Sequence, residues 1–334
     1  AGIREMRVFP NGFGFAALLV LAIYSAWVWP EIAHGVNDWA GGFLSKFVLL
    51  SLFFLQGLKM EMKKLFGAFE NPLKLVAVQV GVFICPILMV FIGYSLDFFE
   101  PGWLNAFILL AFLPTTISSS VVYTRYAHGD ADFALGQSTI SNLISPLVVL
   151  LVWGCLQEEK LQLIETGGME LVAVVFPKVF LLTLLPCFLG WRLSLHPSVQ
   201  KGVRSNGGSN LKYFPSVGIS CLVFFSMGQV ISMEGRETCL ESADELLFPL
   251  VAGWIILVLL SLVWSRCVER PFERRVAILF CLSQKSLAMG LPMLQILSDG
   301  SNASFSYWLI PLVLFHFIQL LFGIPLIGFL RKFV

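Results

Sequence analysis

Two stretches decide the fold of this chain: LPTTISSSVVYTRY (113–126) and AILFCLSQKSLAMGLPMLQIL (277–297). Both are long and largely apolar. However, the first holds a proline before a run of hydroxyl residues, and the second holds Gln-Lys-Ser followed by glycine and proline. Proline lacks a backbone N–H, and hydroxyl side chains compete for the hydrogen bonds of a helix. The two stretches therefore predict helices that are interrupted near Pro114–Ser120 and near Gln284–Ser286.

The composition around these stretches is that of a membrane protein. Of the 334 residues, 57% are hydrophobic and 13% are charged, and the mean hydropathy is +0.83. A soluble domain carries about 25% charged residues, so most of the outside of this chain must face lipid. Irregular backbone is tolerated in hydrocarbon only where it is buried in protein or lines a cavity. We expect an all-α integral membrane protein without the clustered basic and aromatic residues that bind nucleic acid.

Hydropathy predicts ten transmembrane helices. A span needs about 20 apolar residues. The N-terminal apolar run is interpreted as the first span rather than a signal peptide, because no small-residue cleavage site follows it. The two interrupted stretches fall in the fourth and ninth spans. The spans are expected at about 11–30, 39–58, 73–96, 103–127, 131–155, 169–192, 211–233, 244–266, 274–297 and 304–330. The longest breaks between them, HPSVQKGVRSNGGSN (196–210) and MEGRETCLESADE (233–245), are expected to be short Gly/Ser-rich or charged loops.

The basic residues alternate with these spans. With the N-terminus inside, most of the 22 basic residues fall in inner segments, whereas the outer loops hold only Lys160 and Arg236. This is the positive-inside pattern. It predicts that both termini are cytoplasmic, in what we expect to be a bacterial inner membrane. The inner basic residues are Arg4, Arg7, Lys59, Lys63, Lys64, Lys74, Arg125, Arg192, Lys201, Arg204, Lys212, Arg266, Arg270, Arg274, Arg275, Arg331 and Lys332.

The two interruptions occupy the same place in the two halves of the chain, 1–157 and 158–334. Because each half has five expected spans, the second must run with inverted topology. Matched interruptions in inverted halves indicate the midplane binding site of a transporter. Each interruption alone is also explained by a proline kink in a helical bundle. The matched positions and the central Lys285 favour the binding site.

At this point the chain resembles the bile acid:sodium symporters, in the branch of solute carrier family 10 that includes its member 7. The resemblance rests on residues 277–297, on IPLVLFHFIQLLFG (310–323), on PTTISSSVV (114–122) and on SNLISPLVVLL (141–151). It implies two inverted five-helix repeats. Helices 1, 2, 6 and 7 would form a panel domain and helices 3–5 and 8–10 a core domain, in which helices 4 and 9 unwind and cross.

The resemblance also implies sodium ligands, which carry over only in part. A helix 4 pair falls on Ser119 and Ser120, hydroxyls of helix 5 on Ser141 and Ser145, and a glutamine on Gln284, with Gln79 as a further candidate. The position of the family's glutamate is Phe280 here, and Lys285 stands where those members have asparagine. Two cations about 4 Å apart repel by several kcal/mol at an effective dielectric near 20. The pocket therefore holds sodium only if Lys285 is neutral or swings away.

Lys285 is expected near the membrane midplane, where a buried lysine costs roughly 3 kcal/mol or more. One alternative is that it bonds to the carbonyls of broken helix 4 and replaces sodium; the other is that it binds an anion or carries a proton. Lys178 is expected to snorkel or line an external vestibule, and Lys46 to be structural. His316 is either bonded to a neighbouring helix or part of a proton relay. The candidate binding residues at the crossover are Pro114, Thr115, Thr116, Ser118, Ser119, Ser120, Gln284, Lys285 and Ser286.

The sequence favours a secondary transporter that carries a small organic anion by alternating access. Half-helix N-termini and Lys285 would attract the negative group. Two alternatives from other classes stay open. One is a non-transporting regulatory membrane protein with this fold, and the other is an intramembrane hydrolase with a Ser–Lys dyad of Lys285 and Ser119 or Ser120. We expect membrane lipid as a partner, no nucleic acid and no cofactor; sodium would bind only under the condition on Lys285 given above.

Overall fold

The computed structural model describes residues 10–40, 42–59, 71–158, 176–177, 180–196, 198–199, 208–298 and 302–333. These residues are almost entirely helical, and among them the one pairing of extended backbone is an isolated antiparallel bridge between Thr115 and Lys285. The predicted all-helical class is confirmed for this part of the chain. Lys178 and most of the loops expected at 158–165 and 197–209 lie outside the described residues.

Four described helices are long and apolar enough to cross a membrane. They are α5 (Pro72–Ser95), α12 (Gly208–Glu234), α13 (Arg236–Val268) and α16 (Asn302–Leu330). A fifth span is made if α1 (Pro10–Val28) and α2 (Pro30–Trp39), which meet at a bend of 94°, count together. The chain is therefore an integral membrane protein, and the remaining spans of the expected ten stay a prediction.

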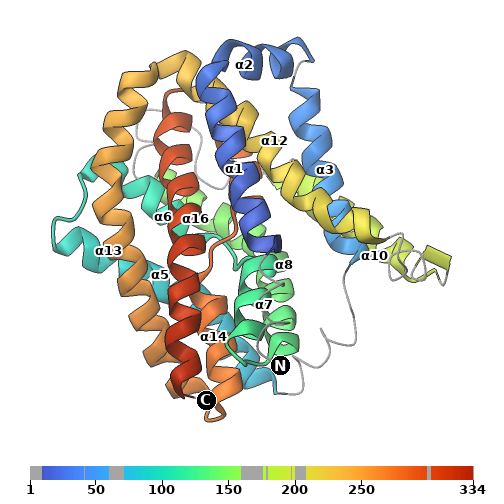
Figure 1. The fold of residues 1–334 in the computed structure, drawn as a ribbon, viewed down its shortest axis with the longest axis vertical. Helices are drawn as coiled ribbons and strands as arrows, with labels where there is room; N and C mark the ends of the chain where they lie inside the picture. The colour runs from blue at the N-terminus through green and yellow to red at the C-terminus, as the bar shows by residue number, and fades with distance from the viewer. Residues whose placement is uncertain are drawn as a thin grey trace. The chain divides into compact units, whose positions relative to one another are not determined.

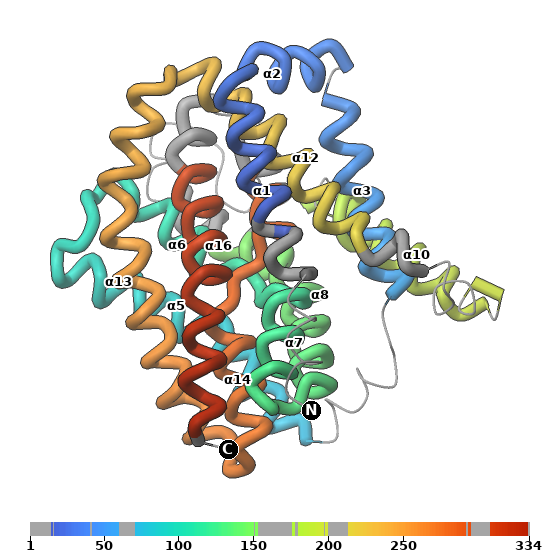
Figure 2. Tube along the Cα trace, in the orientation of Figure 1, coloured from blue at the N-terminus to red at the C-terminus, as the bar shows by residue number. Residues whose placement is uncertain are grey.

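The chain divides into two compact units, each built from two separate pieces of sequence. Unit 1 comprises Ala1–Met60 and Leu181–Leu240, and unit 2 comprises Glu61–Phe180 and Glu241–Val334. In Figure 2, unit 2 takes the cyan-to-green helices α5 to α8 together with most of the orange-to-red helices α13 to α16. The expected repeat boundary between residues 157 and 158 stays a prediction.

Unit 1 is held together by close helix contacts at small residues. α3 (Phe43–Leu58) packs on α10 (Leu185–Ser194), and α12 packs on α1, α2 and α3 (Figure 1). A Cβ on Gly57 would overlap the carbonyl of Cys187, and one on Gly190 would overlap the carbonyl of Phe54. The backbones of α3 and α10 therefore touch, as small residues allow between membrane helices.

One loop expected from the sequence is wrong. The segment MEGRETCLESADE (233–245) was expected to be a charged loop, but it is helical apart from Gly235, which separates α12 from α13. Gly235 has a φ of 86°, a left-handed conformation that glycine adopts without a steric penalty. Because one such residue is enough to end a helix, the polar residues after it form the first turns of α13.

Unit 2 contains two pairs of short helices, and longer helices pack around them. The first pair is α6 (Leu104–Phe112) and α7 (Ile117–Tyr126), and the second is α14 (Phe272–Ser283) and α15 (Leu287–Ser298). α8 (Ala131–Glu158) packs on α6, α7 and α14, while α16 packs on α6, α7 and α15. A Cβ on Gly290 would lie 2.8 Å from Leu113 Cδ1, so α15 approaches the end of α6 closely.

Candidate functional site

The two interruptions lie where the sequence predicts them, and they pair with each other. α6 ends at Phe112 and α7 begins at Ile117, and α14 ends at Ser283 and α15 begins at Leu287. The N–H of Thr116 donates to the carbonyl of Gln284 at 2.9 Å, and the N–H of Ser286 donates to the carbonyl of Pro114 at 2.9 Å. Backbone groups that the broken helices cannot pair internally are thus paired across the break, as burial away from water requires.

The Lys285 ammonium lies inside this crossover and is only 2% exposed. Its Nζ donates to the carbonyls of Val82 at 2.7 Å, Leu113 at 2.8 Å and Ala111 at 3.1 Å. An ammonium has three donors, so these carbonyls use all of them. Two of the carbonyls are at the C-terminal end of α6, where the helix dipole favours a cation.

The carbonyl of Val82 is free to accept because of a proline. Residue 86, four positions further along α5, is Pro86, which has no N–H to donate back to Val82. The proline inside α5 therefore leaves one carbonyl without its helical partner, and Lys285 takes it. A third helix thus contributes to the ammonium site through its backbone.

α8 holds the first interruption. The N–H of Thr115 donates to Ser141 Oγ at 3.2 Å, and Asn142 Nδ2 donates to the carbonyl of Thr115 at 2.7 Å. Ser145 Oγ donates to the carbonyl of Phe112 at 3.1 Å. The two hydroxyls that the resemblance implies as sodium ligands therefore hydrogen-bond to the backbone of the broken helix.

α16 holds the second interruption with a single side chain. Gln319 Oε1 accepts from the N–H of Lys285 at 2.6 Å, and Gln319 Nε2 donates to the carbonyl of Lys285 at 2.6 Å. The same nitrogen lies 2.7 Å from Nδ1 of His316, one turn earlier on α16. We call these three contacts the Gln319 clamp.

Every carbonyl from Ala111 to Thr116 has a hydrogen-bond partner. Lys285 Nζ donates to the carbonyls of Ala111 and Leu113. Ser145 Oγ donates to that of Phe112, the Ser286 N–H to that of Pro114, and Asn142 Nδ2 to that of Thr115. The hydroxyl of Ser120 donates to the carbonyl of Thr116. Since an unpaired buried carbonyl costs about 1–3 kcal/mol, this accounting explains how an irregular segment survives in the protein interior.

The remaining predicted residues divide by exposure. Ser119 Oγ donates to Gln284 Oε1 at 3.1 Å, and both residues are buried, whereas Ser118 is exposed with its hydroxyl 3.3 Å from that of Thr116. Gln79 hydrogen-bonds to Gln137 of α8, at 3.1 Å to the carbonyl and 2.8 Å to the side chain.

Neither hydroxyl of the considered Ser–Lys dyad, Ser119 or Ser120, is among the bonded partners of Lys285 Nζ. Those partners are all carbonyls, which argues against a general base.

Phe280, to which the resemblance assigns the position of the family's glutamate, lies one turn before Gln284. Its side chain is completely buried, and its ring meets that of Tyr123 edge-on at 5.7 Å between centroids. Tyr123 in turn donates to the carbonyl of Leu320 at 2.9 Å. Phe280 therefore makes an aromatic contact between α7 and α14 and offers no charge to balance a bound cation.

Two functional residues were not predicted from the sequence. Asn142 hydrogen-bonds to the backbone of the first interruption, and Gln319 hydrogen-bonds to the backbone of the second. A signal was present, because each lies inside a segment that carries the resemblance: SNLISPLVVLL (141–151) and IPLVLFHFIQLLFG (310–323). A polar amide in an apolar membrane helix needs partners. Nothing in the residue pattern indicates that those partners are the backbones of Thr115 and Lys285.

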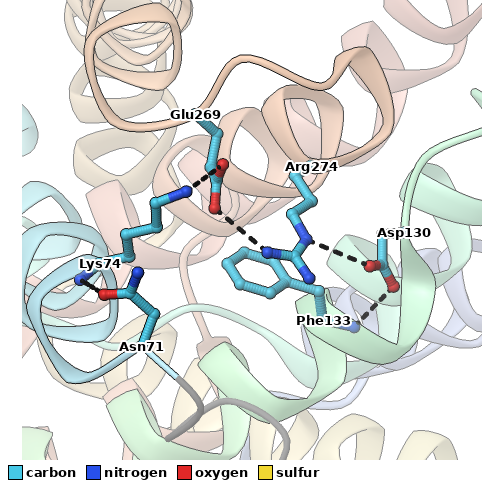
Figure 3. Close-up of polar contacts among 6 residues, drawn as sticks. All are labelled: Asn71, Lys74, Asp130, Phe133, Glu269 and Arg274. Carbon is cyan, nitrogen blue, oxygen red and sulfur yellow. Dashed lines mark hydrogen bonds and ion pairs between the residues drawn. The ribbon is translucent and has the colours of Figure 1, made fainter.

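A second polar group, centred on Glu269, lies at the other end of α14, fifteen residues before Gln284. Figure 3 shows its contacts. Glu269 is 2% exposed, accepts from Lys74 Nζ at 2.8 Å, and pairs with Arg274 Nη1 at 3.4 Å. Arg274 also lies 3.8 Å from Asp130 and over the ring of Phe133. This Glu269 cluster ties the N-terminal ends of α5, α8 and α14 together, and a buried glutamate there was not expected from the sequence.

Comparison with known proteins identifies relatives along most of the chain. The SBF-like CPA transporter family matches residues 14–332. The putative symporter YfeH of Escherichia coli is 28% identical over 279 residues, covering 81% of this chain and 79% of YfeH. An uncharacterized protein of Pseudomonas aeruginosa is 28% identical with the same two coverages. Sodium/bile acid cotransporter 7 of Rattus norvegicus is 24% identical over 340 residues, covering 96% of this chain and 93% of the rat protein.

Proposed function

Since the chain belongs to the SBF-like CPA transporter family, we propose that it is a secondary transporter that carries a small organic anion by alternating access. The relatives named as symporter and cotransporter support transport in general. The observation that carries the proposal is the pairing of the two interruptions around the Lys285 ammonium. Paired breaks in two helices are typical of transporter binding sites.

The substrate anion would bind at the N-terminal ends of α7 and α15. The first N–H groups of a helix lack helical partners and carry the positive end of the dipole, so they attract anions. Ser118 in the first turn of α7 is the one exposed residue of the nine candidates at the crossover. It is therefore the first polar side chain that an arriving substrate would contact.

Lys285 would serve as a built-in cation rather than as the direct partner of the substrate. Its three donors are taken by carbonyls, so none is left for an anion in this conformation. An ammonium on three carbonyl oxygens uses the same kind of ligand that sodium prefers. With Phe280 in place of a carboxylate, these residues do not fit a sodium ion in addition to the ammonium, and transport would depend weakly on sodium.

The geometry also supports an inverted-repeat organisation. α8, which contains the expected fifth span, holds Thr115, and α16, which contains the expected tenth, holds Lys285. Thr115 and Lys285 are bridge partners, so corresponding helices of the two halves would each hydrogen-bond to the interruption of their own half. We propose that unit 1 corresponds to the panel domain and unit 2 to the core domain, a grouping that the helix contacts within each unit support.

We further propose that both termini face the cytoplasm of a bacterial cell. The alternation of basic residues along the sequence supports this orientation. Single cysteines in the 158–165 segment should react with a membrane-impermeant thiol reagent from outside, and those in the 197–209 segment only from inside. The reverse labelling would overturn the orientation.

Uptake into proteoliposomes tests the function. Purified protein would be assayed with a labelled bile acid and a panel of other labelled organic anions, in sodium and in choline buffer. We expect saturable uptake of at least one probe, with little difference between the two buffers. Lys285→Ala should abolish uptake or make it dependent on an added cation, and Lys285→Ala with Phe280→Glu should increase the dependence on sodium.

Two results would contradict the proposal. No saturable uptake of any anion by folded wild-type protein would favour a non-transporting role. Strong, saturable sodium dependence of the wild type that Lys285→Ala leaves unchanged would remove Lys285 from the coupling mechanism.

A further inference from the structure

Gln319 joins two groups that face it from different elements: the backbone of Lys285 and the imidazole of His316. Its oxygen accepts from the Lys285 N–H at 2.6 Å, and its nitrogen reaches the Lys285 carbonyl at 2.6 Å and His316 Nδ1 at 2.7 Å. A side-chain amide has one accepting oxygen and two N–H donors in one plane. All of these are used, so the three partners fix which way the amide faces.

This arrangement requires His316 Nδ1 to accept a hydrogen bond. A neutral imidazole can do so with its hydrogen on Nε2, but an imidazolium carries hydrogen on both nitrogens. A proton on Nδ1 would then face the N–H donor of Gln319 at the present 2.7 Å. Turning the amide over would bring its nitrogen to the Lys285 N–H instead, which again sets donor against donor. Protonated His316 and the Gln319 clamp therefore exclude each other.

We propose that His316 Nδ1 is a proton-binding site that is coupled through Gln319 to the backbone of the α14–α15 interruption, and that the proton is the coupling ion of this transporter. The proton comes from water on one side of the membrane, adds to the lone pair of Nδ1, and leaves by the reverse step. No other covalent bond forms or breaks. The inference rests on the proposed function, and it adds the ion that Lys285 leaves unassigned.

The surroundings of His316 hold few other groups that could titrate with it. Among the elements packed on α16, α6 and α15 carry no titratable side chain in their sequences, and the α14–α15 interruption carries Lys285. The turn Arg331–Phe333 carries Arg331 and Lys332 at the C-terminal end of α16, and α13, which meets α16 through the rings of Trp254 and Phe322, carries its charged residues near its two ends. α7 presents Tyr123, which donates to the carbonyl of Leu320, and carries Arg125 and Tyr126 at its last turn. Lys285 is thus the charge that His316 faces through the clamp, and a second cation there would weaken the hold on the crossover further.

Release of the clamp would free both backbone groups of Lys285. The neighbouring bonds from Thr116 N–H to Gln284 and from Ser286 N–H to Pro114 would then be the remaining backbone links between the two interruptions. The first interruption has no equivalent control, because Ser141 and Asn142, which hold Thr115, do not titrate. Protonation should therefore loosen one interruption and leave the contacts of the other in place.

Hydrogen–deuterium exchange of the full chain in lipid nanodiscs tests this without any substrate. Protection of the amides at 285–287 would be measured between about pH 5 and about pH 8, corrected for the pH dependence of chemical exchange, with the amides at 115–116 as the internal reference. We expect protection at 285–287 to fall by about tenfold or more as the pH falls. Protection at 115–116 should change less.

Two substitutions fix the clamp in opposite states. His316→Gln offers an oxygen to the Gln319 amide but binds no proton, so protection should stay high at every pH. Gln319→Met keeps the length of the side chain but makes none of the three bonds, so protection should be low at every pH. His34→Gln, on the partly exposed His34 of α2, is the matched control and should behave as wild type.

A wild-type pH response in His316→Gln, or full protection in Gln319→Met, would overturn the inference. Both variants would first be shown to be helical and monodisperse, and a failure of one to fold leaves the other as the test. Exchange does not depend on uptake, so this inference can fail while transport is demonstrated. The exchange result can also be positive in a protein that transports no anion of the panel; the proton-binding site then stands, while the proposed function fails and the proton's role as coupling ion fails with it.

Discussion

The two interruptions are built alike but differ in charge. At the first, Ser141 and Asn142 of α8 hold the N–H and carbonyl of Thr115, and at the second Gln319 of α16 holds both groups of Lys285. Only the second carries an ammonium, and that ammonium bonds to carbonyls of the first. Lys285 thus belongs to one broken helix, and its ammonium pairs the carbonyls left open at the end of the other.

The largest expected effect comes from removing that ammonium. Lys285→Ala leaves the carbonyls of Val82, Ala111 and Leu113 without their partner and opens a cavity among them. We expect a loss of about 3–5 kcal/mol in the free energy of unfolding. Unfolding in detergent, followed by circular dichroism, measures it, and Lys46→Ala on the exposed Lys46 of α3 should change stability by less than about 0.5 kcal/mol. Equal losses in the two variants would mean that the carbonyl contacts of Lys285 do not stabilise the fold.

The next prediction compares the two holding side chains directly. Gln319→Met leaves the N–H and the carbonyl of Lys285 unpaired, whereas Asn142→Leu leaves only the carbonyl of Thr115, because Ser141 still accepts from its N–H. With about 1–3 kcal/mol for each unpaired group, Gln319→Met should cost about twice as much as Asn142→Leu in the same unfolding assay. The reverse order would show that the α8 contacts dominate the crossover.

A smaller effect is expected at the Glu269 cluster. Glu269→Gln removes a buried charge whose partners Lys74 and Arg274 are 38% and 41% exposed in their side chains. Since exposed partners are screened by water, the loss should be about 1–2 kcal/mol, below the 3–5 kcal/mol of a fully buried pair. The loss should shrink as the salt concentration rises. An effect independent of salt would indicate that the glutamate acts through its hydrogen-bond geometry alone.

The parts of this site that could be predicted are those whose residues are unfavourable inside a membrane helix. Pro114, the hydroxyls after it and the Gln-Lys-Ser of the second stretch signal interruptions by themselves, and a buried lysine signals that carbonyls of the broken helix are near. Of the two alternatives for Lys285, bonds to those carbonyls agree with its contacts to Ala111 and Leu113. The expected charged loop at 233–245 failed because one left-handed glycine ends a helix as effectively as a loop does.

The partners from distant parts of the chain could not be predicted in the same way. Val82 and Gln319 lie 203 and 34 positions from Lys285. The carbonyl of Val82, freed by Pro86, cannot be recognised from the identity of its own side chain. The partner of an amide such as Gln319 in an apolar helix depends on which helices pack against it. Glu269 lies between two predicted spans, and nothing in its sequence neighbours shows that the turn before α14 is buried.

The smallest effect on stability should come from substitution of Ser118. An effect of that substitution on uptake would therefore report on substrate binding rather than on folding. Its side chain is exposed in the first turn of α7, whereas Ser119 beside it is buried and bonded to Gln284. Ser118→Ala should therefore change the free energy of unfolding by less than about 0.5 kcal/mol, and Ser119→Ala should cost more because it removes a buried hydrogen bond. If an anion binds at the N-terminus of α7, loss of one hydrogen bond of about 0.5–1.5 kcal/mol should raise the KM of uptake by about two- to twelvefold in Ser118→Ala. Uptake kinetics and unfolding of both variants measure the two effects, and an unchanged KM in Ser118→Ala would move the substrate away from the α7 terminus.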